Sequence, residues 1–302
     1  MNFELQQPQH LVSLATSALI VSVDVNVWTA TKQDRAISNE VTRSKNASSE
    51  AGKFTKNLLA DSPDHKALLN YRQTVYNWLQ RATYDWAGSM RLLPVVNLEK
   101  FKKEYNEHEA AFNVLLDKFI IAYPSIISDA AFKQGDMFNR SEYPDAVDVR
   151  AKFRIKLHVS QVPASDFRAG GIAQALADDL KSQYEKQAQE IIDEVMDDAA
   201  GRLVMIAERL QNVCAESEPD DDGKVKRKKI YDSTVTQAKE ICETLQHFNL
   251  TNNHALTSAV RDLAFTLDGI SVEDLRESAH TRREVYEGID DMLTKFKPIK
   301  TY

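Results

Sequence analysis

The chain of 302 residues is poor in cysteine and glycine. Its two cysteines, Cys214 and Cys242, fall on apolar faces of expected helices, which predicts buried, reduced thiols and no disulfide. The nine glycines form no phosphate-binding loop, and the pair Gly170-Gly171 is better explained as a linker before a helix. No serine lies in a nucleophile elbow. These absences argue against nucleotide hydrolysis and serine hydrolysis, and we predict a protein without enzymatic activity.

Long apolar runs are also missing. The longest, such as residues 18–21 and 119–123, are far shorter than the roughly 20 residues of a membrane-spanning helix. The first residues lack the basic start and apolar core of a secretion signal. We therefore expect no membrane association and a cytoplasmic location. The net charge of −7 and the pI near 5.6 disfavour broad nucleic-acid binding but leave room for a local basic patch.

The strongest pattern in the chain is a helical one. Between Ile172 and Val213, apolar residues recur about every 3.7 positions, which predicts one long amphipathic helix buried by the chain's own helices. A charged turn follows, and Tyr231–Phe248 carries the same kind of pattern. Two further helices are expected over His254–Leu267 and Val272–Phe296, the second preceded by a capping-box variant with Ser271 at its start.

Two segments alternate strictly between apolar and polar residues, which predicts half-buried strands near residues 19–29 and 152–162. The polar side of the first carries Asp24, and that of the second carries Arg154 and Lys156. Cross-strand charge pairing predicts that the two strands are neighbours, with Asp24 beside Arg154 or Lys156.

The residues between these strands show helical patterns. Lys32–Arg43 is a short amphipathic piece, and Pro63 begins a helix that extends to about Thr83. Asn97 is a suitable N-cap for a third helix, which we expect to break near Pro124 because proline removes a backbone donor.

Together these patterns predict a mostly α (α+β) fold with a small antiparallel sheet of two to three strands. Residues 1–165 form a mixed α+β region that contains both strands. Residues 166–302 form a helical bundle, built on a long, coiled-coil-like helical hairpin over 172–248.

The candidate contact residues are basic or aromatic. A basic run follows the acidic turn of residues 218–222, and its simplest role is to balance that turn's charge. The alternative is contact with phosphates or with an acidic partner. Trp28 lies on the polar side of its strand, where another helix or a partner could cover it. The full set comprises Lys224, Lys226, Arg227, Lys228, Lys229, Trp28, Arg154 and Lys156.

Metal and cofactor sites are not predicted. Glu104 and His108 share a helix face, which is half of a metal site, but no second such pair accompanies them. The acidic turn resembles a calcium loop until its twelfth position, where Lys229 replaces the bidentate glutamate that calcium requires.

Several stretches resemble a family of unknown function found in tailed phages and some bacteria. They are Asp24–Asp34 (DVNVWTATKQD), Ala51–Leu58 (AGKFTKNL), Met90–Pro94 (MRLLP), Phe138–Pro144 (FNRSEYP) and Lys152–Phe153 (KF). Genes of this family often neighbour those of an AAA+ ATPase of the MoxR or cobaltochelatase type and of a von Willebrand A-domain protein. The resemblance implies an accessory or adaptor protein for a remodelling machine, and it implies no catalytic residues.

Three functions remain open at this point. The leading hypothesis is a non-enzymatic phage accessory protein that binds other proteins, including an AAA+ ATPase. The second is a factor that binds or anneals single-stranded nucleic acid, and the third is a structural component of the virion. The sequence predicts no oligomeric state.

Overall fold

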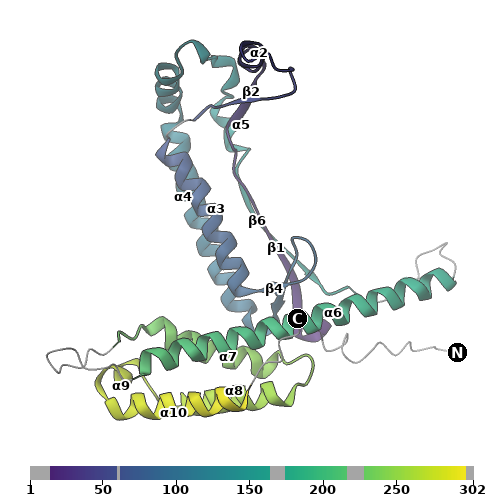
Figure 1. Cartoon of the computed structure of the whole chain (residues 1–302), viewed down its shortest axis with the longest axis vertical. Helices are drawn as coiled ribbons and strands as arrows, with labels where there is room; N and C mark the ends of the chain where they lie inside the picture. Colours follow the sequence, from purple (N-terminus) through teal and green to yellow (C-terminus); the bar gives the residue numbers. More distant parts are fainter. Residues whose placement is uncertain (1–13, 60–61, 164–173, 216–227, 297–302) are drawn as a thin grey trace. The chain divides into compact units, whose positions relative to one another are not determined.

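The computed structural model describes residues 14–59, 62–163, 174–215 and 228–296. The chain is mostly helical with two small sheets (Figure 1), which confirms the predicted mostly α (α+β) class. It divides into two compact units. Unit 1 comprises residues 1–20, 83–98 and 159–302, and unit 2 comprises residues 21–82 and 99–158. Residues 1–20 and 83–98, which the prediction placed in the mixed region of residues 1–165, belong to unit 1 together with the helices after residue 158.

The main helices of unit 1 are α6 (Gln174–Cys214), α7 (Asp232–His247), α8 (His254–Thr266) and α10 (Ala279–Lys295). Helix α6 packs against α7 and α10, and α8 packs against the same two helices. The predicted helical hairpin is therefore present as α6 and α7. Its core is largely aliphatic and includes Ile192, Leu203, Leu210, Val235, Leu245, Leu263, Val285 and Ile289.

The apolar stripe of α6 is buried along part of its length. From Ala188 to Cys214, one residue in every three or four is buried, as its helical period predicts. In the turns before Ala188, the buried residue is Ala177, and Leu176 is exposed. The prediction that the chain's own helices bury this stripe thus holds for the C-terminal two thirds of α6 in the part of the chain that the structure describes.

The expected single helix over Val272–Phe296 is wrong, because two helices occupy it. Helix α9 (Val272–Glu277) ends at Ser278, and α10 begins directly after it. The Ser278 side chain accepts a hydrogen bond of 3.1 Å from the backbone N–H of Thr281 and so caps α10. The predicted capping box before α9 is confirmed, since Ser271 and Asp274 exchange side-chain and backbone hydrogen bonds.

The larger sheet has the strand order β4-β5-β1-β6, with β1 at Ala18–Asn26 and β6 at Arg154–Gln161. The two predicted strands are neighbours, and Arg154 forms an ion pair with Asp24 across them. Strands β4 (Tyr84–Asp85) and β5 (Arg91–Pro94) enlarge the predicted sheet. Neither is long enough to show the alternation by which a strand is recognised.

A second, antiparallel sheet joins β2 (Thr31–Asp34) to β3 (Phe54–Asn57) in unit 2. Helix α2 (Arg35–Ser44) follows β2 directly, and Asp34 caps it by accepting a hydrogen bond of 3.1 Å from the backbone N–H of Ile37. The helix predicted from Lys32 therefore starts later, because its first residues pair with β3.

Helices α3 (Pro63–Ala82) and α4 (Leu98–Gln134) lie side by side in unit 2 (Figure 1). The predicted break at Pro124 is wrong, because α4 continues through it to Gln134. Buried side chains lie on both sides of the proline, namely Phe119 and Tyr123 before it and Ala130 after it. Packing of both halves offsets the lost backbone hydrogen bond. A short helix, α5 (Ala146–Arg150), precedes β6.

One helical segment of the described residues, Val95–Met137, is long and apolar enough to cross a membrane by length and composition alone. It contains α4, whose Phe112, Leu116, Phe119 and Tyr123 are buried inside the protein. Asp117 and Lys118 interrupt the same stretch. Length and composition are therefore weak evidence for a membrane span.

Candidate functional site

Three of the predicted contact residues lie in unit 2, around the strand pair β1 and β6. Arg154 and Lys156 are exposed on the polar side of β6, and Arg154 is paired with Asp24 of β1. Trp28, just beyond β1, is half-buried, and the Lys152 ammonium lies 6.0 Å from the centre of its ring. The structure thus combines cations and one aromatic ring along one polar strand face.

Of the basic residues in the run 224–229, the structure describes Lys228 and Lys229. Lys224, Lys226 and Arg227 lie outside the described residues. The Lys228 ammonium donates hydrogen bonds to the backbone and side-chain oxygens of Asn212, at 3.1 and 2.5 Å. The Lys229 ammonium lies 5.0 Å from the centre of the Tyr231 ring. These two lysines therefore contact uncharged groups within unit 1, and the acidic turn of residues 218–222 that the run was predicted to balance lies outside the described residues.

The Glu104 and His108 pair joins α4 to α3. The Trp78 indole donates a hydrogen bond of 2.6 Å to Glu104, and His108 Nδ1 lies 2.9 Å from the Tyr71 hydroxyl. Burial lowers the pKa of His108 despite the nearby carboxylates. Among the described residues, no group of three potential ligands could hold a metal ion. The pair is thus part of a helix–helix contact.

A buried ion cluster lies beside β3. The Lys56 ammonium is 2.6 Å from Glu142 and 3.6 Å from Asp34, and it donates a 2.8 Å hydrogen bond to the Met137 carbonyl. Burial opposes its charge, but the hydrogen bond and negative charges of its two partners outweigh that effect and raise the Lys56 pKa. Its nitrogen is committed to these contacts, so the cluster serves structure rather than chemistry.

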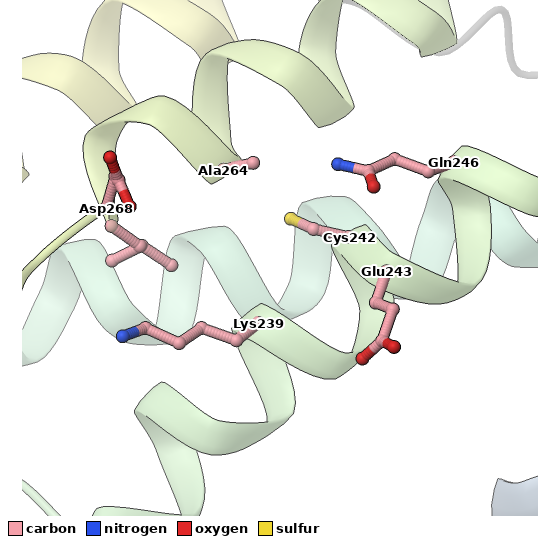
Figure 2. A pocket seen from close by; sticks show the side chains of 7 residues that line it. Lys239, Cys242, Glu243, Gln246, Ala264 and Asp268 are labelled. Carbon is pink, nitrogen blue, oxygen red and sulfur yellow. The ribbon is translucent and has the colours of Figure 1, made fainter.

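Unit 1 contains a cavity of about 190 Å³ between α7 and α8. Figure 2 shows the Cys242 thiol directed toward Ala264 on its wall, with Lys239 and Asp268 nearby. The Lys239 ammonium donates a hydrogen bond of 2.9 Å to the Ile270 carbonyl. Cys242 and Cys214 are buried free thiols, as predicted, and burial raises their pKa values to about 12 and about 11. Thiols held in the protonated form are poor nucleophiles, so Cys242 is not a reactive thiolate in this cavity at neutral pH.

Three strongly exposed apolar side chains of unit 2 lie on α4, and Val147 of α5 is exposed as well. Val114 is 68% exposed, Ile121 is 81% exposed and Phe132 is 92% exposed. They are roughly two and three helical turns apart and so share one side of the helix. We call this side the outer face of α4. This face was not predicted, although the shared helical angle of the three residues is visible in the sequence.

Each of three comparisons, with protein-family models, with curated proteins and with solved structures, finds no match to this chain.

Proposed function

We propose that this chain is a non-enzymatic adaptor that binds another protein through the outer face of α4. The observation that carries the proposal is the row of three large apolar side chains that the unit leaves in solvent. A monomeric protein seldom aligns such residues on its surface unless a partner covers them.

The spacing of the outer face indicates the kind of partner. Between the three large side chains lie Asp117 and two serines, and the exposed positions follow one another by three or four along α4: Ala110, Val114, Asp117, Ile121, Ser125, Ser128 and Phe132. This is the spacing of a seam that receives the apolar side of a second helix. The occupant that we propose is an amphipathic helix of the partner.

Asp117 of the outer face and its neighbour Lys118 already have partners within unit 2. Asp117 pairs with Arg150 at 2.6 Å, and Lys118 pairs with Asp64 at 2.9 Å. Opposite charges are thus balanced in place, so the face does not select a strongly charged partner. Apolar contact with a helix is the interaction that it offers.

The size of the face favours a transient partner over a permanent dimer. Even three aromatic side chains, at about 150–250 Å² each, would supply less than the roughly 800 Å² per partner of a standard stable interface. Two of the three side chains here are the smaller valine and isoleucine. A second copy of the chain is therefore the weaker candidate for a lasting interface.

The resemblance to the phage family suggests which proteins carry the partner helix. We propose an AAA+ ATPase, with a von Willebrand A-domain protein as a second partner, in the cytoplasm of an infected cell. A role as a virion component is the alternative, and mass spectrometry of purified particles would detect it.

Site-specific photocrosslinking tests this proposal. A photoreactive residue at position 121 is expected to crosslink to the ATPase in cells that carry both proteins, and Phe132→Lys is expected to reduce that crosslink at least about tenfold. The matched control is Phe265 on α8, which is 83% exposed but lies in unit 1. Phe265→Lys should leave the crosslink unchanged.

Other outcomes would overturn the proposal in recognisable ways. Crosslinks solely to a second copy would make the outer face a dimer interface, and crosslinks solely to lipid would make it a membrane contact. The absence of any protein adduct, or an adduct that Phe132→Lys does not weaken, would remove the adaptor role of this face.

A further inference from the structure

The polar side of the β1 and β6 pair is an open, cationic surface in unit 2. Arg154, Lys156 and His158 are exposed on alternate positions of β6. On the polar side of β1, Asp24 is the one acidic residue in the described strand, and Arg154 already neutralises it. The surface therefore keeps a positive charge although the whole chain is acidic.

Trp28 lies at the end of this surface and is held there by its backbone. Its carbonyl accepts a hydrogen bond of 2.7 Å from His65 Nε2 of α3. Two residues later, Ala30 is fully buried with a φ of 53°, in the left-handed region that favours glycine. A strained non-glycine conformation persists where the surrounding structure fixes the backbone, and such positions are often found at functional sites.

Lys152 connects the aromatic ring with the cations of β6. Its ammonium lies 6.0 Å from the centre of the Trp28 ring, and the residue itself is exposed. Among the described residues, neither Lys152 nor Lys156 has a carboxylate partner. Each can therefore contact an anion from solution without first breaking an ion pair.

We propose that this surface binds an extended single-stranded nucleic acid, with phosphates on Lys152 and Lys156 and one base stacked on Trp28. The two lysines are four residues apart, about 13 Å along an extended chain, a distance comparable to that between alternate phosphates of an extended strand. A row of cations beside an aromatic ring is the usual arrangement for sequence-tolerant single-strand binding. This site is independent of the outer face of α4.

Fluorescence anisotropy with a labelled thymidine oligomer tests the proposal on the full chain. With two phosphate contacts, the logarithm of the binding constant is expected to fall with the logarithm of salt with a slope of about −1.4. Lys152→Gln with Lys156→Gln should weaken binding at least about tenfold at low salt and bring the slope close to zero. Trp28→Leu should weaken binding about fivefold or more and leave the slope unchanged, whereas Trp28→Phe should restore most of the affinity.

A matched control and a competitor make the test specific. Lys228→Gln with Lys229→Gln removes the same charge from unit 1 and should leave binding unchanged. Inorganic polyphosphate should compete poorly, since it offers no base to Trp28. Circular dichroism and thermal melting of each variant separate lost binding from lost folding.

Four results would overturn the proposal. The first three are no binding at low salt, equal binding by the Lys152→Gln/Lys156→Gln variant, and loss of binding in the Lys228→Gln/Lys229→Gln variant instead. The fourth is competition by polyphosphate that equals that of the oligomer, together with no effect of Trp28→Leu. The last result would define a general polyanion surface. The photocrosslinking experiment on α4 is unaffected by any of them.

Discussion

Each unit has a different kind of core. Unit 1 packs aliphatic side chains and two thiols between long helices, and its ring–ring contact is Tyr84 with Phe248. Unit 2 packs aromatic rings around α3 and α4, and it also buries polar side chains. The buried aromatic residues include Phe101, Phe112, Phe119, Tyr123 and Phe153, and the buried polar residues include His65, Lys56 and Gln134.

The difference shows where each unit derives its specificity. Helices with a regular apolar stripe can pack in several similar ways, so unit 1 depends on the fit of its side chains. Both units also contain hydrogen bonds between distant parts of the chain, such as those from the Arg276 guanidinium to the Ile230 carbonyl in unit 1. In unit 2 they come from buried neutral side chains. The Tyr143 hydroxyl donates to the Leu58 carbonyl at 3.0 Å, and the Gln134 amide donates to the Asn57 carbonyl at 3.1 Å. Such bonds define one arrangement but leave a costly polar group when broken.

The largest effect is expected from removing an aromatic ring of unit 2. Phe119 is fully buried and contacts the rings of His65, Tyr123 and Phe153 at centroid distances of 5.9, 5.8 and 5.3 Å. Phe119→Ala should lower the free energy of unfolding by about 3–5 kcal/mol, measured by urea denaturation. The exposed Phe132→Ala should change it by less than about 0.5 kcal/mol. Hydrogen exchange that accelerates equally in both units would show that they unfold as one.

A smaller loss is expected from breaking the buried ion cluster. Glu142→Gln removes the closer carboxylate of Lys56 and leaves Asp34 at 3.6 Å. Leaving a buried ammonium with one distant partner should cost about 2–3 kcal/mol, measured by chemical denaturation. The matched control is Asp24→Asn, which breaks the exposed pair with Arg154 and should cost less than about 1 kcal/mol. Equal effects of the two variants would contradict a special role for the buried cluster.

Two glycines of unit 1 test how closely its side chains fit together. A Cβ at position 288 would lie 2.7 Å from Thr266 Oγ1 and 2.8 Å from its Cγ2, whereas one at Gly201 would meet nothing within 4 Å. Overpacking should make Gly288→Ala destabilising by about 1–2 kcal/mol. Gly201→Ala should stabilise α6 by about 0.5–1 kcal/mol. Thermal unfolding of both variants tests the contrast, and a stabilising Gly288→Ala would show that Thr266 can move aside.

The smallest effect is a dependence on pH in unit 2. Burial lowers the pKa of both His65 and His108 below the ordinary value of 6.5. Their neutral forms therefore favour the folded state, so this contribution is present above pH 6.5 and is lost as the pH falls toward the lower pKa of the folded state. Melting temperatures between pH 7 and pH 5 should fall less in a His65→Gln/His108→Gln variant. Parallel curves for the two proteins would exclude this origin.

The contrast between the units also explains what could be predicted. The period of α6 and the return helix α7 are local properties of the sequence, and both were found. The pairing of β1 and β6 was found because two strongly alternating strands carried opposite charges. Three features could not be predicted: the position where β2 ends, the second sheet and the Lys56 cluster. They depend on contacts between Asp34, Lys56 and Glu142, which lie far apart in the chain and show no local pattern.

The candidate sites follow the same rule. Trp28, Arg154 and Lys156 were recognised because strand alternation placed them on a polar side. The contribution of Lys152 was missed, because it lies in the turn before β6, where alternation does not apply. The outer face of α4 was missed because exposed and buried apolar residues of one helix look alike until a neighbour such as α3 is placed beside it.

The path of the chain between the units bears on how the protein forms during synthesis. Unit 2 is complete once residue 158 has been made, since both of its segments lie between residues 21 and 158. Unit 1 joins residues 1–20 and 83–98 to everything after 158. Because domains fold as units while the chain is being made, unit 2 can fold on the ribosome first. Residues 14–20 then join the core of unit 1 only after the helices that follow residue 158 have been made.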